Sequence, residues 1–302
     1  MVRQIFIALA AGLVALLASG LVVLAGPPAF AQWRGRLELA TISQGQLERT
    51  YRVYRPARRD ARPGLVLDLH SARTNGFLEE LATRFDGQAE RFGWIVVYPD
   101  GFADGWEPYG CCQHPGVDDV AFLGEIISRL EATDGVDPER VFVMGLSRGG
   151  MMAYRLACEL SSRVAAIAPV AGNMADANGD VRSVPCHPDR PVSVLTINGV
   201  ADTVVPIKGG GRTAPLQDVL SRWRELNGCD ARESVATSGG ALSRTWQCRA
   251  GSEVRSIVVE GVGHTWPGIP LSSVPWGPAA SLDASQAIAE FFAAHTRAHV
   301  SQ

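Results

Sequence analysis

The chain has 302 residues, of which 46% are hydrophobic and 20% charged, and its formal net charge is −3 at pH 7. This charge balance gives no electrostatic basis for binding nucleic acid or an anionic membrane surface, and it fits a neutral or mildly polar small-molecule substrate better. A chain of this length and composition can bury one sizeable hydrophobic core.

Residues 1–31 have the layout of a cleavable signal peptide. Arg3 precedes an uncharged apolar run over residues 5–24, and the small residues of Ala29-Phe30-Ala31 suit cleavage after Ala31. The apolar run approaches the ~20 residues that a membrane-spanning helix needs, so an uncleaved anchor is the alternative. We expect a secreted or periplasmic protein that is not stably inserted in a membrane, with one mature domain over residues 32–302.

Segments with strand character and segments with helical periodicity alternate along the rest of the chain. The expected strands cover residues 64–70, 94–98, 141–144, 165–170, 192–197, 243–247 and 254–260, and the expected helices cover residues 77–91, 117–132, 149–160, 216–226 and 282–294. This alternation predicts an α/β fold in which a mainly parallel sheet has helices on both faces. Ligands of such sheets bind at the carboxyl ends of the strands.

The sequence Gly145-Leu146-Ser147-Arg148-Gly149 lies between an expected strand and an expected helix, the setting of a nucleophilic serine on a sharp strand-to-helix turn. Such a turn is crowded, so glycine is needed two residues before and two residues after the serine. The backbone N–H of Arg148 opens the helix and can stabilise an oxyanion. A phosphate-binding turn is the alternative, but no Gly-Lys-Ser/Thr or Gly-x-Gly-x-x-Gly pattern follows. We therefore predict that Ser147 is a nucleophile.

A nucleophilic serine needs a histidine as base and an acid that orients the histidine. In hydrolases with this turn the chain order is serine, acid, histidine, and Asp202 and His264 follow late strands in that order. His70 precedes the serine, so we assign it to shaping the loop after the first core strand. His295 and His299 lie in or beyond the last helix and are expected to be solvated.

A second oxyanion donor is expected from the loop after the first core strand, at the backbone N–H of Ser71 or Ala72. Trp106 and Trp266 lie in loops at the carboxyl ends of strands. Either of them can wall an acyl pocket, with ordinary packing as the alternative. This chemistry needs no metal ion and no organic cofactor, and we predict neither.

All six cysteines lie beyond the expected signal peptide, so disulfides are the default interpretation in an exported protein. Cys229 and Cys248 flank a short segment that can fold back as a hairpin, and we predict a bond between them. Cys111, Cys112, Cys158 and Cys186 allow three pairings, among which the sequence does not choose. The adjacent Cys111 and Cys112 are expected to reach different partners, because a bond between neighbours strains the peptide.

Several segments can be compared with known families: Leu69-His70, Tyr98-Pro99-Asp100-Gly101, Cys111-Cys112, Val117-Asp118-Asp119-Val120, the serine turn, Ala168-Pro169-Val170 and Gly263-His264-Thr265-Trp266-Pro267-Gly268. Together they resemble the secreted polyhydroxybutyrate depolymerase and feruloyl esterase family, of carbohydrate-esterase type. The resemblance implies an α/β-hydrolase fold and a triad of Ser147, Asp202 and His264. Glycine usually follows the histidine of the first loop in that family, where this chain has Ser71. If that position requires a positive φ, serine is strained there.

These features predict an exported serine carboxylic-ester hydrolase that acts through an acyl-enzyme. The chain ends soon after its last helix, without a linker and a further domain, which favours soluble esters or oligomers over solid polyester. A peptidase or an acyltransferase on the same triad is the first alternative, because a motif does not fix the leaving group or the acceptor. A non-catalytic binding protein is the second alternative.

Overall fold

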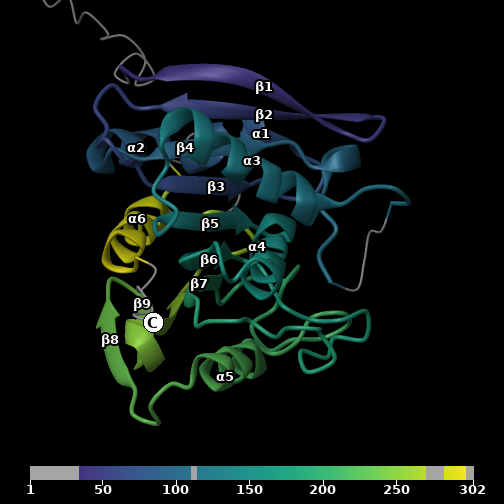
Figure 1. The fold of residues 1–302 in the computed structure, drawn as a ribbon. Helices are drawn as coiled ribbons and strands as arrows, with labels where there is room; N and C mark the ends of the chain where they lie inside the picture. The colour runs from purple at the N-terminus through teal and green to yellow at the C-terminus, as the bar shows by residue number, and fades with distance from the viewer. Residues whose placement is uncertain (1–33, 110–113, 270–281, 297–302) are drawn as a thin grey trace, which may run out of the picture. The chain divides into compact units, whose positions relative to one another are not determined.

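A single mixed β-sheet runs through the residues that the computed structural model describes, which are 34–109, 114–269 and 282–296 (Figure 1). The strand order is β1-β2-β4-β3-β5-β6-β7-β10-β9-β8. Neighbouring strands are parallel from β4 through β10 in that order, and antiparallel strands flank them on both sides. The strands are β1 (Arg36–Gln44), β2 (Leu47–Arg55), β3 (Leu65–Leu69), β4 (Ile95–Pro99), β5 (Val141–Leu146), β6 (Ala166–Val170), β7 (Ser193–Gly199), β8 (Ser234–Ser238), β9 (Ala241–Gln247) and β10 (Glu253–Val259).

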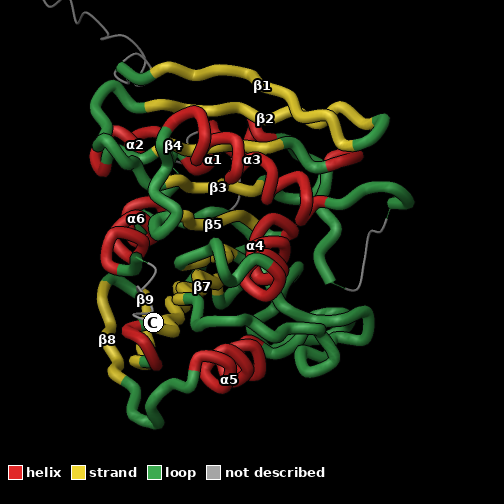
Figure 2. The backbone as a smooth tube through the Cα atoms, in the orientation of Figure 1, coloured by secondary structure: helices red, strands yellow, loops and turns green. Residues whose placement is uncertain are grey.

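Helices cover both faces of this sheet (Figure 2). Side chains of α3, α4 and α5 belong to the hydrophobic core on one face, and those of α2 and α6 belong to the core on the other. None of the helices in the described ranges has the length and apolarity needed to cross a membrane. The helices are α1 (Gly76–Thr83), α2 (Asp86–Phe92), α3 (Asp119–Asp134), α4 (Arg148–Glu159), α5 (Leu216–Asn227) and α6 (Ala284–Ala294), with short 3-10 helices η2 (Phe102–Asp104) and η3 (Arg249–Gly251).

The predicted α/β fold with a mainly parallel sheet is confirmed, and each expected strand corresponds to an observed one. The central strands were identifiable because both of their faces are buried, which makes them continuous apolar runs. The single helix expected over residues 77–91 is wrong. Arg84 adopts a left-handed conformation with φ 51° and ends α1, and α2 begins two residues later.

Three strands have no counterpart in the sequence-based prediction: β1, β2 and β8. β1 and β8 are the edges of the sheet, and most of their side chains are exposed, so they lack an apolar run. β2 alternates apolar and polar residues, but it places Arg49 at a buried position. A buried arginine breaks the pattern from which an amphipathic strand is recognised.

Two disulfides lie in the described residues. The predicted bond between Cys229 and Cys248 is present, and a second bond joins Cys158 at the end of α4 to Cys186. Cys111 and Cys112 lie outside the described residues. We expected Cys111 and Cys112 to form bonds with different partners. Because Cys158 and Cys186 form a disulfide with each other, neither of them is such a partner.

A buried ion pair connects β2 to the start of α3. Arg49 Nη2 is 2.7 Å from Asp119 Oδ1, and the two side chains are 3% and 2% exposed. The other carboxylate oxygen of Asp119 accepts the Glu107 N–H at 2.8 Å. Asp118 caps α3 by accepting the Ala121 N–H, whereas Asp119 forms this buried pair. The pair therefore ties the outer sheet to the segment that precedes α3.

Removal of one member of this pair should destabilise the fold strongly. Asp119→Ala leaves a buried guanidinium without its counter-charge, and we expect a loss of about 3–5 kcal/mol in the free energy of unfolding. Arg62→Ala removes an exposed partner of Asp137 and should cost less than about 1 kcal/mol. Urea denaturation of both variants measures the difference, and similar losses would contradict the role given to Asp119.

Candidate active site

Ser147 lies in a sharp turn between β5 and α4. Its φ of 55° and ψ of −112° fall outside the regions that non-glycine residues favour. The Ser147 N–H donates to Val170 O at 2.8 Å, and α4 begins at the next residue. A Cβ at Gly145 would lie 2.5 Å from Leu69 O, and one at Gly149 would collide with the same oxygen. Glycine at both positions therefore lets the turn pack against the end of β3.

The side chains of Ser147, His264 and Asp202 form one hydrogen-bonded chain. His264 Nε2 lies 2.9 Å from Ser147 Oγ, and His264 Nδ1 lies 2.8 Å from Asp202 Oδ2. The three residues follow β5, β10 and β7, whose carboxyl ends meet at one edge of the sheet. The structure brings together the three residues that chain order singled out. An imidazole so placed can accept the hydroxyl proton while the carboxylate orients the ring.

Asp202 is held as a buried carboxylate. Its side chain is 0% exposed, and Oδ1 accepts the N–H groups of Val204 and Val205, both at 2.8 Å. Burial alone would raise the pKa of Asp202, but the hydrogen bonds from His264 and from these two N–H groups outweigh burial and lower the pKa below its usual value. The acid is therefore ionised at any pH at which the protein would work.

His70 is buried and organises the loop after β3. Its Nε2 accepts the Gly101 N–H at 2.8 Å, and its Nδ1–H donates to Ser71 O at 2.7 Å. The Trp106 indole N–H donates to the carbonyl oxygen of His70 at 2.9 Å. Both ring nitrogens of His70 are thus committed to the loop, which agrees with the shaping role assigned from its place in the sequence.

The expectation that His295 is solvated is wrong. The residue is 9% exposed, its Nδ1–H donates to Phe291 O at 2.7 Å, and its ring lies 4.2 Å from the Phe291 ring. The end of α6 packs inward, which the polar residues after it did not indicate. His299 lies outside the described residues.

The buried carboxyl group of Glu79, in α1, joins the serine turn to the loop after β3. It accepts backbone hydrogen bonds from Leu146, which precedes Ser147, and from Ser71. The residue is 2% exposed, and this burial raises the pKa of Glu79 well above its usual range. The nearby carboxyl of Asp68 raises it further. Glu79 belongs to no recognisable motif, so sequence reasoning did not identify it.

The loop after β3 places Ala72 at the cavity beside Ser147. Because the Ser71 N–H is directed to Glu79, the Ala72 N–H is the better candidate for a second oxyanion donor. Ser71 does not have a positive φ, so the backbone strain that a serine would have in that conformation is absent. Arg73 adopts the left-handed conformation instead, with φ 63°.

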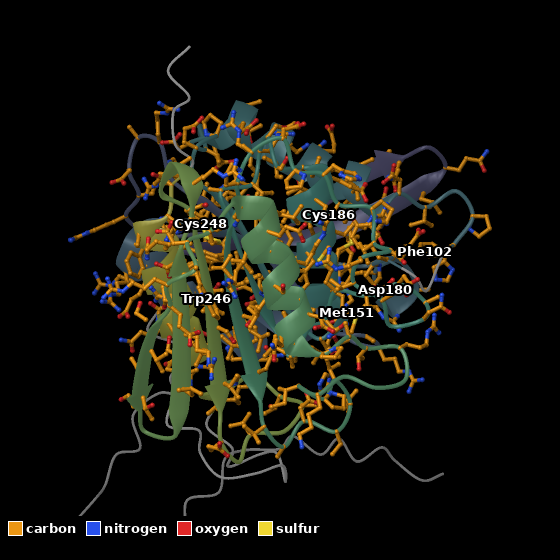
Figure 3. All side chains as sticks on the ribbon, turned by 90° about the horizontal axis from the view of Figure 1, so that it is seen from below. Phe102, Met151, Asp180, Cys186, Trp246 and Cys248 are labelled. Atoms are coloured by element: carbon orange, nitrogen blue, oxygen red, sulfur yellow. A yellow bond between two sulfur atoms is a disulfide. The ribbon has the colours of Figure 1, made fainter. Side chains whose placement is uncertain are left out.

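A cavity of about 340 Å³ opens beside Ser147, within the size range of small-ligand sites. Its apolar lining comes from Ala72, Pro108, Met151, Met174, Ala175, Val204 and Val205, and its polar lining from Tyr109, Arg148, Asn173, Asp176, Arg212 and Thr213. In Figure 3 Met151 lies on the same side of α5 as Asp180, whereas Trp246 and Cys248 lie on the other side. Within the described ranges, no three His, Cys, Asp or Glu side chains are grouped so as to hold a metal ion.

Neither tryptophan proposed as a pocket wall is among the described residues that line this cavity. Trp106 is 1% exposed and packs beneath the loop of His70, with the two rings 5.0 Å apart. Trp266 is 2% exposed, and its indole N–H donates to Ser285 Oγ at 3.0 Å. For both residues the structure replaces the pocket role with packing, because each side chain points into the core below the strand ends.

Comparisons with known proteins agree with this geometry. Residues 49–187 match the family model described as Esterase PHB depolymerase. The chain is 32% identical to the "Putative esterase NocK" of Nocardia uniformis subsp. tsuyamanensis over 263 residues, covering 76% of this chain and 73% of that protein. It is 30% identical to "Feruloyl esterase B" of Piromyces equi over 185 residues, which are 57% of this chain and 34% of that protein.

The fold is also shared with solved structures. An acetyl xylan esterase from Aspergillus awamori aligns with a TM-score of 0.62 at 17% identity, over 85% of this chain and 99% of that one. At this identity the likeness concerns the arrangement of strands and helices. It agrees with the α/β-hydrolase fold implied by the sequence motifs.

Glu79→Ala should lower the free energy of unfolding by about 1–3 kcal/mol, because the N–H groups of Leu146 and Ser71 lose their buried acceptor. Glu79→Gln keeps an oxygen acceptor of similar shape and should lose much less. Urea denaturation followed by circular dichroism compares the two variants. Equal losses would rule out the acceptor role of Glu79.

The stability contributed by Asp202 should depend on pH. Because its folded pKa is lowered, the ionised carboxylate stabilises the folded state above the unfolded pKa of about 3.9, and this stabilisation disappears as pH falls through the lower folded value. Wild type should therefore exceed Asp202→Asn in stability by a constant amount at neutral pH, with a gap that closes below about pH 4. Denaturant titrations from neutral to acid pH measure the gap, and a gap that widens in acid would refute the assignment.

Proposed function

Because the chain belongs to the PHB depolymerase family of esterases, we propose that it hydrolyses carboxylic esters with Ser147 as nucleophile, His264 as base and Asp202 as orienting acid. The observation that carries this proposal is the hydrogen-bonded chain from Ser147 Oγ through both nitrogens of His264 to Asp202. A hydroxyl is a weak nucleophile unless an adjacent base takes its proton, and this geometry supplies that base.

The first half of the reaction forms an acyl-enzyme. His264 Nε2 takes the proton of Ser147 as Oγ attacks the ester carbonyl carbon, which gives a tetrahedral intermediate with a negative oxygen. The N–H groups of Arg148 and Ala72 bind that oxygen, and the N-terminal end of α4 adds a favourable dipole. The bond from the carbonyl carbon to the alcohol oxygen then breaks, and His264 gives its proton to the leaving alcohol.

The second half releases the acid. A water molecule takes the place of the alcohol, gives a proton to His264 and attacks the acyl carbon. The bond to Ser147 Oγ breaks, and Oγ recovers its proton from His264. Asp202 stays ionised throughout and stabilises the imidazolium form of His264 in each half.

The proposed substrates are soluble esters or short oligomers. The cavity of about 340 Å³ holds a small acyl or hydroxyacyl group, and its lining beside Ser147 is mainly apolar. Relatives and a structural neighbour are named for feruloyl and acetyl xylan esters. Methyl ferulate, 4-nitrophenyl acetate and hydroxybutyrate oligomers are therefore the esters with which to begin.

We further propose that the protein is exported. Residues 1–31 act as a signal peptide that is cleaved after Ala31, and residues 32–302 form the mature esterase domain in the periplasm or outside the cell. The disulfides Cys158–Cys186 and Cys229–Cys248 support an oxidising destination, because such bonds form and persist there.

Ser147→Ala should lower kcat for all of these esters by at least about 10⁴-fold, and Asp202→Asn should lower it by about 10⁴-fold, while both proteins stay folded. A fluorophosphonate probe should label wild type at Ser147 and leave Ser147→Ala unlabelled. Steady-state kinetics on the ester panel, with a peptide amide alongside, measures the losses. Unlabelled wild type that hydrolyses none of the esters would overturn the proposed function, and faster cleavage of the amide would indicate a peptidase.

A further inference from the structure

One arginine that lines the cavity at Ser147 has no ion pair among the described side chains. Arg148 lines this cavity, and no ion pair among the described side chains includes it. Arginines of this protein that are comparably buried, such as Arg55 and Arg155, do have carboxylate partners. A partly buried charge is normally paired, so an unpaired one beside a reactive serine indicates a place for a ligand charge.

The surroundings of the Arg148 side chain favour an anion. Burial lowers the pKa of Arg148, and the positive charge of Arg73 lowers it further. A Cβ on Gly105 would lie 2.6 Å from Arg148 Nη1. The absence of a side chain at Gly105 therefore gives the guanidinium the room that it occupies.

Arg73 belongs to the loop that carries the second oxyanion donor. It follows Ala72, which lines the same cavity, and its left-handed backbone with φ 63° is unfavourable for a residue with a side chain. The Arg73 side chain is exposed and is not among the residues that line the cavity, so it acts on Arg148 through its charge. No ion pair of Arg73 occurs among the described side chains either.

Two other charged residues line the cavity beside Arg148, and they have opposite signs. Asp176 is the one carboxylate of the lining, and it accepts the N–H groups of Asn178 and Asp180 at 2.8 and 2.9 Å, so it is engaged within its own turn. Arg212 adds another positive charge to the lining. The described lining therefore holds two arginines and one aspartate, although the net charge of the whole chain is −3.

We propose that this cavity accepts esters that carry a free carboxylate, and that Arg148, with the positive charge of Arg73 nearby, binds that carboxylate while Ser147 attacks the ester bond. The proposal rests on the proposed function of Ser147 and names its substrate class. Guanidinium groups match carboxylates because their N–H donors form paired, charge-assisted hydrogen bonds. An oligomer of a hydroxy acid has this chemistry, since it ends in a carboxylate a few bonds from its terminal ester.

The test compares two esters that differ in one charge. The linear dimer of 3-hydroxybutyrate ends in a free carboxylate, and the methyl ester of that dimer does not, while both contain the same internal ester. Chromatography measures kcat/KM for cleavage of the internal ester. Wild type should prefer the free acid, and the preference should weaken as salt is added.

The ratio of the two kcat/KM values should fall by about ten- to a hundredfold in Arg148→Gln, mainly through KM, and by a smaller factor in Arg73→Gln. The ratio is the readout, because it cancels any effect on the chemical step that both esters share. Arg62→Gln removes an exposed positive charge elsewhere and should keep the wild-type ratio. Wild-type ratios in both Arg148→Gln and Arg73→Gln, or an equal fall of the ratio in Arg62→Gln, would overturn the carboxylate site.

Binding without turnover separates this inference from the proposed function. Calorimetry measures binding of each ester to Ser147→Ala. This variant should bind the free-acid dimer at least about tenfold more tightly than the methyl ester, and the added Arg148→Gln change should remove the difference. If wild type hydrolyses neither ester but this binding difference is present, the proposed function fails and the carboxylate site stands. If wild type cleaves both esters and Ser147→Ala binds them equally, the proposed function stands and the carboxylate site fails.

Discussion

The contact between the serine turn and the end of β3 is the constraint on which the rest of the site depends. A side chain at Gly145 or Gly149 would strike Leu69 O, so only glycine lets the turn come this close. The approach sets the start of α4 directly against Leu69 and the carbonyl oxygen of His70. The unfavourable backbone of Ser147 is tolerated because the bond from its N–H to Val170 O fixes the turn.

The two loops that supply the acid and the histidine are joined in the same way, through the backbone. The Ala201 N–H donates to Val262 O at 2.9 Å, and a side chain at Gly199 would collide with that carbonyl group. At the serine turn, the Glu79 carboxyl accepts backbone hydrogen bonds from Leu146 at the end of β5 and from Ser71 in the loop after β3. Main-chain contacts therefore set the positions of these loops, and the hydrogen bond to Asp202 orients the His264 ring within them.

Chain order, turn chemistry and hydrophobic runs were enough to predict the parallel core, the three residues that meet at its edge and one disulfide. They failed where tertiary packing decides. Arg49 in β2 is buried only because Asp119, seventy residues later, provides its counter-charge. Trp106 and Trp266 stand near the right strand ends, but which way an indole points depends on partners such as His70 O and Ser285. Glu79 acts through backbone groups of distant residues, and no local pattern marks such a role.

The positions of the two disulfides have a consequence for how the chain is assembled. Each joins cysteines that are close in sequence, 28 and 19 residues apart, and both lie after the serine turn. Short loops of this kind cost little entropy to close, so each bond can form as soon as its own segment meets an oxidant, before the whole sheet is complete. Among the described residues of β1 to β5, burial and the Arg49–Asp119 ion pair hold the strands to the rest of the fold. Formation of the Cys158–Cys186 bond therefore fixes the far end of α4, the helix that begins after Ser147, to a segment made soon after it.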